Sequence, residues 1–184
     1  MNLPAPSPLW QWHFDPEENW LCLSLDDLGT LRTGLSRKNV RDKDFQFDVF
    51  SVSDSDCYMS ILESLEGTPL LENVRFAFVT CINALASVQF HKEVAAKNWL
   101  FDESDNTSHF PQQSQLVNQL ASVKTTRDVS DVIIIDVRDN FSTCLLMQCL
   151  QLNESKSLPR FSLVKLSISR LFPFTGHSLE DFNE

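Results

Sequence analysis

The N-terminal part of the chain alternates between apolar and polar positions in short runs. In the first, second and fourth of these runs every second residue is large and apolar, which is the period of a β-strand with one buried face. The runs lie at 9–14, 20–25, 30–35 and 45–49. Turn-forming residues at 15–19 and 26–29 separate the first three runs. The pattern predicts an antiparallel β-meander.

After residue 53 the apolar period changes to that of an α-helix. Ser53 or Asp54 can cap the start of a first helix, and Gly67 suits its end. Its apolar stripe consists of Tyr58, Ile61, Leu62 and Leu65. We therefore predict an amphipathic helix that packs one face against the meander.

A second helix is predicted directly after the first. Thr68 as N-cap and Pro69 at the first helical position would begin it, and it would end near Lys92. Apolar residues over 74–88 cover much of its circumference. A helix of this kind normally lies at the centre of a core.

The second half of the chain favours strands. The acidic, polar stretch 102–109 marks the best boundary, and 115–123 fits either a helix or a strand. Strands are predicted at 132–137, 144–152 and 162–171. Their spacing is typical of a small barrel or sandwich.

These patterns together predict an α+β protein with two domains. The first is an N-terminal α/β domain, an antiparallel β-meander plus two helices, and the second is a C-terminal β-barrel-like domain. The predicted limits are 1–101 for the first domain, 102–113 for a linker, 114–176 for the second domain and 177–184 for an acidic tail.

Composition and charge narrow the possible functions. The 184 residues include 25 Asp+Glu against 15 Lys+Arg, so the formal net charge is −10. This balance argues against a general binder of nucleic acid or anionic membranes, because phosphate contacts need clustered cations. The first six residues lack the basic and apolar segments of a signal peptide, so we expect a cytoplasmic protein.

The residues that usually carry catalysis are sparse. Four glycines form no phosphate-binding loop, and four histidines lack metal-ligand spacing. The five cysteines lie in apolar surroundings and are interpreted as buried thiols in a reducing compartment. We expect no catalytic residue, cofactor or metal. A cysteine enzyme is the remoter alternative.

The charges are unevenly distributed along the chain. Residues 1–31 carry five acidic residues and no Lys or Arg. Basic residues then gather at Arg32, Arg37, Lys38, Arg41 and Lys43, and again at Lys92 and Lys97, which precede Trp99. Such segments are either solvated loops or a docking surface for an acidic partner. Each tryptophan is either a core residue or, for Trp99, an interface anchor.

Several ordered motifs resemble those of one known family. They are Trp10-x-Trp12-x-Phe14-Asp15, Gly29-x-Leu31 followed by Arg37-Lys38, Asn83-Ala84-Leu85, Lys92 with Lys97-x-Trp99, Cys144-Leu145-Leu146 with Gln148-Cys149, and the strand 165–171. This set resembles the bacterial cell-division protein family ZapC over nearly the whole chain. The region 102–127, rich in Gln, Ser and Asn, departs from the family pattern.

The resemblance implies a non-enzymatic protein of the cytoplasm, recruited to the division site at midcell. It implies binding to polymers of FtsZ, the acidic bacterial tubulin homologue, with lateral bundling of protofilaments, a stabilised Z ring and a lower FtsZ GTPase activity. From the acidic charge balance we expect no nucleic-acid or membrane partner.

The candidate FtsZ-binding residues are Leu23, Arg32, Arg37, Lys38, Arg41, Lys92, Lys97 and Trp99. Leu23 would line a pocket or support its wall. Bundling requires two filament contacts, so we expect a monomer with two surfaces, with a dimer as the other possibility. The alternative function is a small-ligand-binding module with an apolar pocket in the β-rich half.

Overall fold

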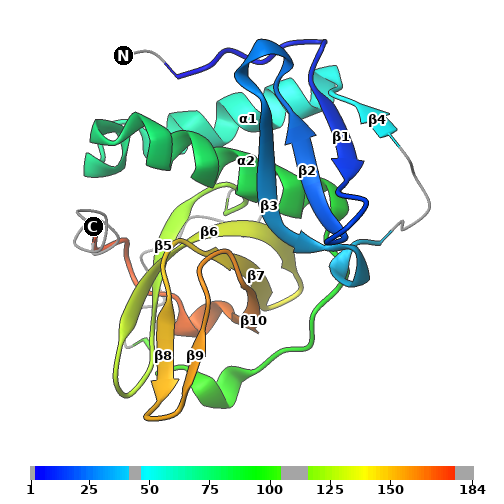
Figure 1. Cartoon of the computed structure of the whole chain (residues 1–184). Coiled ribbons are helices and arrows are strands. Elements are labelled where there is room, and N and C mark those ends of the chain that lie inside the picture. Colours follow the sequence, from blue (N-terminus) through cyan, green and yellow to red (C-terminus); the bar gives the residue numbers. More distant parts are fainter. Residues whose placement is uncertain (1–2, 42–46, 105–115, 177–184) are drawn as a thin grey trace. The chain divides into compact units, whose positions relative to one another are not determined.

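The computed structural model describes residues 3–41, 47–104 and 116–176 (Figure 1). The chain divides into two compact units. Unit 1 comprises Met1–Glu63 and Asn73–Glu93, and unit 2 comprises Ser64–Glu72 and Val94–Glu184. Of the linker expected at 102–113 only 102–104 is described, and the expected tail at 177–184 lies outside the described residues. The domain limits drawn from the sequence stay a prediction.

Unit 1 contains a four-stranded antiparallel sheet in the order β3-β2-β1-β4 (Figure 1). The strands are β1 (Gln11–Phe14), β2 (Trp20–Ser24), β3 (Thr30–Ser36) and β4 (Phe47–Val49). Trp12 pairs with Leu23 and Phe14 with Leu21, so these four side chains share the buried face. The predicted meander is confirmed, with β4 added to the free edge of β1.

Helix α1 (Val52–Leu65) begins with a reciprocal cap. The Asp54 N–H donates to Ser51 Oγ at 3.1 Å, and the Ser51 N–H donates to Asp54 Oδ2 at 2.8 Å. This pair is a capping box, which satisfies backbone donors that the first turn leaves open. The predicted cap at Ser53 or Asp54 was therefore placed too late in the chain. Ser51 caps the helix, and Asp54 completes the capping box from within the first turn.

Helix α2 (Val74–Phe90) starts later than the sequence predicted. The Asn73 side chain caps it by accepting the Phe76 N–H at 3.0 Å. Pro69 instead opens a short 3₁₀ turn, η3 (Pro69–Glu72), while Thr68 Oγ1 donates to the Leu65 carbonyl at the end of α1. The Thr-Pro signal marked a real turn, but Asn73 is the better acceptor for the long helix.

An aromatic cluster joins both helices to the sheet of unit 1. Trp10 contacts Phe50, Tyr58 and Phe78 edge to face, with ring centroids 5.1–6.4 Å apart, and Trp12 meets Phe90 at 5.3 Å. Such pairs add to the stabilisation from burial alone. Trp10 and Trp12 are therefore core residues, the role expected for them from the sequence.

Unit 2 is built on a second antiparallel sheet, in the order β10-β7-β6-β5, with a separate β8-β9 hairpin (Figure 1). The strands are β5 (Leu120–Lys124), β6 (Val129–Arg138), β7 (Phe141–Leu146), β8 (Leu150–Asn153), β9 (Lys156–Leu158) and β10 (Leu163–Ser167). The ambiguous stretch 115–123 thus contributes a strand. The sequence missed β9, which lies between the predicted strands at 144–152 and 162–171.

The sheet of unit 2 is open, so the barrel-like part of the prediction needs correction. Within the described ranges, β5 and β10 form its two edges and no ladder joins them. After β10 the chain passes through the 3₁₀ turn η7 (Ile168–Arg170), and only a single bridge, Ser122 with Phe172, reaches β5. The α+β class is confirmed, because each unit has an antiparallel sheet and the long helices precede the second sheet.

Candidate functional site

Two basic segments that are far apart in the sequence are joined by backbone contacts in unit 1. Val40 and His91 form an isolated antiparallel bridge. The Arg41 N–H donates to the Phe90 carbonyl at 2.8 Å, and the Lys92 N–H donates to the Asn39 carbonyl at 2.7 Å. The segment after β3 is thereby fixed to the C-terminal end of α2.

This junction brings together two segments whose basic residues are separate groups in the sequence. We define the basic surface as Arg37, Lys38, Arg41 and Lys92. A single cationic surface is suited to binding an acidic protein, because opposite charges steer the encounter and fix its register.

Arg41 has a structural role within the basic surface. Its Nη2 donates to the Gln89 carbonyl at 2.6 Å. The last carbonyls of a helix lack intrahelical donors and carry partial negative charge, so a guanidinium there is favourable. His91 acts in the same region, because its Nδ1 donates to the Ser87 carbonyl at 2.5 Å. The end of α2 is therefore capped by His91 and by Arg41, and Arg41 is a residue that the sequence suggested for docking.

Arg37 also packs against its own unit. It begins the 3₁₀ turn η2 (Arg37–Asn39), its guanidinium lies 4.5 Å from the centre of the Phe14 ring, and its N–H donates to the Asn19 carbonyl at 2.8 Å. Lys38 and Lys92 are exposed, and the described residues provide no ion-pair partner for either. These two lysines hold the most available charge of the surface.

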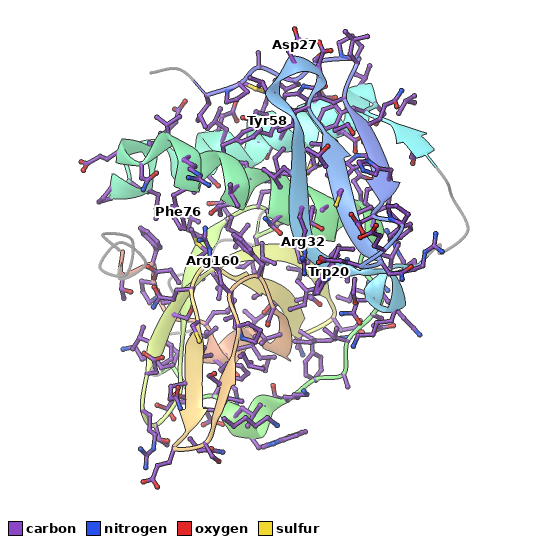
Figure 2. The ribbon with its side chains drawn as sticks, in the orientation of Figure 1. Trp20, Asp27, Arg32, Tyr58, Phe76 and Arg160 are labelled. Carbon is purple, nitrogen blue, oxygen red and sulfur yellow. The ribbon has the colours of Figure 1, made fainter. Side chains whose placement is uncertain are left out.

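Arg32 belongs to the opposite face of the sheet from Trp12. It lies on β3 across from Cys22, and its guanidinium stands 4.4 Å from the centre of the Trp20 ring (Figure 2). It also forms an exposed ion pair with Glu18, which compensates part of its charge. Its positive field is therefore weaker than the sequence suggested.

The turn before β2 is held by its own carboxylate. Asp15 Oδ1 accepts the backbone N–H groups of Glu18 and Glu17 at 2.6 and 2.9 Å. These bonds, that of Glu18 above all, lower the pKa of Asp15 below its usual value. The acidic turn expected from the sequence is a fixed structural element.

Leu23 is completely buried, with 0% of its surface exposed, between Trp12 on β1 and Leu31 on β3. Its side chain is not available for a direct contact with a protein partner in this conformation. Any effect of Leu23 on binding must pass through the sheet that it supports.

Lys97 and Trp99 belong to unit 2, not to the basic surface of unit 1. Trp99 lies in the 3₁₀ turn η4 (Asn98–Leu100) with 77% of its surface exposed. Lys43, the last member of the basic segment expected from the sequence, lies outside the described residues.

Three of the cysteines offer little reactivity in the described structure. Burial raises the pKa of the Cys57 thiol to about 11 and those of Cys81 and Cys144 to about 12. Thiols of this kind stay protonated at neutral pH and are poor nucleophiles. Cys149 is exposed and Cys57 is half-buried, contrary to the expectation that all five are buried.

Two further observations concern sites of other kinds. Across the described ranges, no three His, Cys, Asp or Glu side chains are grouped as metal ligands would be. The helices described there are too short or too polar to span a membrane.

Comparison with known proteins gives a consistent result over residues 3–177. Residues 3–92 match the family profile described as cell-division protein ZapC, N-terminal, and residues 94–177 match that of the C-terminal part. The Tolumonas auensis cell division protein ZapC is 31% identical over 170 residues, which cover 92% of each chain. Its counterpart from Vibrio cholerae is 30% identical over 168 residues, 90% of this chain and 89% of the relative.

Proposed function

The chain belongs to the ZapC family of cell-division proteins, and we propose that it acts by binding polymers of FtsZ. In this proposal it promotes lateral bundling of the protofilaments, stabilises the Z ring and catalyses no reaction itself. A ligand that binds the polymer more tightly than the free subunit shifts the equilibrium towards polymer. Slower turnover of subunits then lowers the GTPase activity of FtsZ.

The observation that carries the proposal is the basic surface. In a chain with a net charge of −10, Arg37, Lys38, Arg41 and Lys92 come together from two distant segments. A local concentration of cations in an acidic protein is well suited to an acidic filament.

Net repulsion between two acidic proteins does not oppose this contact strongly. At physiological ionic strength the Debye length is about 8 Å, so charges farther apart than this are largely screened. The charges within the interface therefore decide the interaction. Lys38 and Lys92 are the residues most suited to pair with carboxylates on the filament, since Arg37 and Arg41 also serve their own unit.

The direct test is pelleting of the protein with FtsZ and GTP, combined with microscopy of the polymers. We expect co-sedimentation and bundles with the wild-type protein. Lys38→Glu and Lys92→Glu should each weaken co-sedimentation by roughly threefold, the effect of an exposed ion pair, and the double variant by more. Higher salt should reduce wild-type binding in the same way.

A matched control separates the local surface from overall charge. Lys156→Glu makes the same change in charge on an exposed residue of β9 in unit 2, and it should leave co-sedimentation unchanged. Arg37→Glu with Lys38→Glu is a stronger but less clean variant, because Arg37 covers Phe14. If Lys38→Glu and Lys92→Glu pellet like the wild type, with normal circular dichroism, the basic surface is not the contact.

A further inference from the structure

Helix α1 carries apolar side chains on the side that faces away from the core of unit 1. Its buried residues Tyr58, Ile61 and Leu65 repeat at steps of three and four and mark the inner side. Val52 and Met59 lie seven residues apart on the opposite side, where they are 78% and 45% exposed. Exposed apolar residues at this spacing are typical anchors for a protein partner.

Carboxylates alternate with these two anchors along the helix. Asp56 follows Val52 by four residues, and Glu63 follows Met59 by four residues. Both carboxylates are exposed, so the four side chains form one line along the outer side of α1 (Figure 1 shows the helix). We call Val52, Asp56, Met59 and Glu63 the acidic face of α1.

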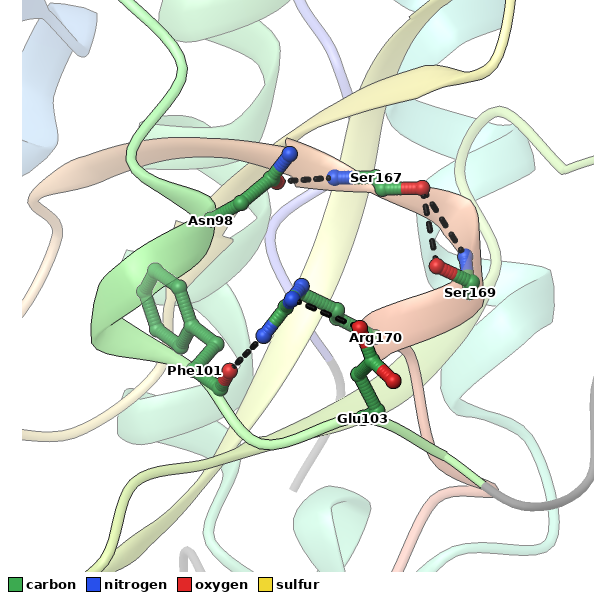
Figure 3. Close-up of polar contacts among 6 residues, drawn as sticks. All are labelled: Asn98, Phe101, Glu103, Ser167, Ser169 and Arg170. Atoms are coloured by element: carbon green, nitrogen blue, oxygen red, sulfur yellow. Dashed lines mark hydrogen bonds and ion pairs between the residues drawn. The ribbon is translucent and has the colours of Figure 1, made fainter.

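The described part of the chain provides no cation that neutralises this face. Residues 47–74 contain six Asp or Glu and no Lys or Arg. Among the described residues, Asp56 and Glu63 have no ion-pair partner. Glu103 of unit 2 differs, because Arg170 binds its carboxylate at 2.8 Å (Figure 3). The acidic face therefore keeps its negative charge available for a partner.

Further apolar surface lies beside the start of α1. Val49, the last residue of β4, and Leu9 are each 63% exposed. The Phe50 N–H donates to the Trp10 carbonyl at 3.0 Å, so the residue before Trp10 is held next to the segment that leads into the helix. Exposed apolar residues that are grouped in this way mark interaction sites, whereas isolated ones are ordinary.

The charge of the acidic face restricts what can cover it. Nucleic acid and anionic lipids carry phosphates, which the two carboxylates repel. An acidic polymer is disfavoured for the same reason, because like charges that face each other across an interface are costly. A protein segment with Lys or Arg beside apolar side chains fits, since it can cover Val52 and Met59 and pair with Asp56 and Glu63.

We propose that the acidic face of α1 is a docking site for a basic amphipathic segment of a partner protein other than FtsZ. This inference goes beyond the proposed function and does not depend on it. The acidic face and the basic surface both belong to unit 1. Combined with the proposed function, the docking site makes the chain a link between an acidic polymer and a basic partner.

The experiment measures the binding of a fluorescent synthetic peptide to the full chain by anisotropy. The probe is an amphipathic helix of Leu and Lys with about 18 residues, or about five turns. A second peptide has the same composition in scrambled order. We expect the amphipathic peptide to bind roughly tenfold more tightly than the scrambled one, because only its helix presents apolar anchors and cations on one side.

Two double variants test the two kinds of contact. Val52→Ala with Met59→Ala removes the apolar anchors and keeps the helix, and it should weaken binding of the amphipathic peptide by roughly tenfold. Asp56→Asn with Glu63→Gln removes both charges, and it should weaken binding by roughly fivefold and reduce the dependence on salt.

Matched controls make similar changes in unit 2. Val117→Ala shortens another exposed apolar side chain. Asp139→Asn removes an exposed carboxylate from the turn after β6, where asparagine tolerates the φ of 54°. Both controls should bind the amphipathic peptide like the wild type, and all variants should keep the wild-type circular dichroism.

Several outcomes would overturn the docking site. Equal binding of the two peptides, or wild-type affinity in Val52→Ala with Met59→Ala, would reduce the effect to general attraction between opposite charges. Loss of co-sedimentation with FtsZ in that variant would assign the face to the polymer. A wild-type dimer in light scattering that the variant makes monomeric would assign it to a second copy of the chain. Failure of the wild-type protein to pellet with FtsZ would remove the proposed function only, and the peptide result would stand.

Discussion

Arg41 and Gln89 are joined by a hydrogen bond of 2.6 Å, from Nη2 of the arginine to the carbonyl oxygen of the glutamine. The bond places a cation from the segment after β3 at the negative end of α2. It also explains why the two basic segments stay together, since the Arg41 backbone binds Phe90 beside it. One side chain thus supports both the fold and the geometry of the basic surface.

Replacing Arg41 should therefore affect stability and binding together. We expect Arg41→Ala to lower the free energy of unfolding by about 0.5–1 kcal/mol, the usual effect of a charge at a helix terminus. Urea denaturation followed by circular dichroism measures this change. Arg41→Lys, which keeps the charge, should lose less. Equal stability of Arg41→Ala and the wild type would show that the bond to Gln89 contributes little.

Asn83 should be important for stability, although it is buried. It is buried on α2, and its Oδ1 accepts the Gly34 N–H of β3 at 2.7 Å. Asn83→Ala leaves that amide without its acceptor, which costs about 1–3 kcal/mol. Hydrogen exchange at Gly34 should quicken as well. Asn73→Ala, which removes the cap of α2, should destabilise by about 1 kcal/mol without this local signal at Gly34.

The segment after η7 should depend on a buried carboxylate for its stable position. Asp131 has no exposed surface, and its Oδ1 accepts Thr175 Oγ1 at 2.9 Å and Ser122 Oγ at 2.5 Å. We expect Thr175→Val to speed hydrogen exchange of the Phe172 amide by roughly tenfold, equivalent to about 1.4 kcal/mol. Amides of β7 provide the internal reference. Unchanged exchange at Phe172 would mean that its bridge to Ser122 holds the segment without Thr175.

The buried thiols predict a loss of stability at high pH. Burial raises the pKa of the Cys81 and Cys144 thiols from the ordinary 9.0 to about 12. Because the unfolded chain releases these protons first, their stabilising effect is complete below pH 9 and is lost as the pH rises towards 12. The melting temperature should fall between pH 8.5 and pH 10.5 by less in Cys144→Ala than in the wild type. An identical fall in both proteins would assign the effect to other groups.

Reactivity should separate the one exposed cysteine from the buried ones. Cys149 is exposed, whereas Cys22, Cys81 and Cys144 are buried. We expect one fast phase with a thiol reagent at neutral pH and slow reaction of the others, limited by opening of the fold. Cys149→Ser should abolish the fast phase. A fast phase that survives this substitution would show that a buried thiol is accessible.

Much of the fold could be read from local patterns. The alternation around Trp10 and Trp12 predicted a strand with a buried aromatic face, and the structure has that strand. The errors in the predicted helix starts were also local, since several polar residues near each start are adequate caps. Ser51 and Asn73 are the actual caps, because their oxygens meet the open N–H groups. Capping propensity alone does not decide which of several neighbouring polar residues is the N-cap.

The candidate site was less predictable. Composition singled out the basic residues, yet Arg37 covers Phe14, Arg41 caps α2 and Arg32 pairs with Glu18. None of these partners lies next to its arginine in the sequence. In the sequence, Lys38 and Lys92 did not stand out from the other basic residues. In the structure, they carry the most exposed charge of the basic surface.

The sequence by itself determined the class of the fold, the position of most strands and helices, and the family, because periodicity and ordered motifs are properties of neighbouring residues. Only the tertiary structure decided which charged and aromatic side chains remain available. It buried Leu23 within the sheet, joined the segment of Arg41 to that of Lys92, and left the Trp99 indole in solvent. The physical reason is that burial and hydrogen bonding depend on residues distant in the chain, which no local pattern specifies.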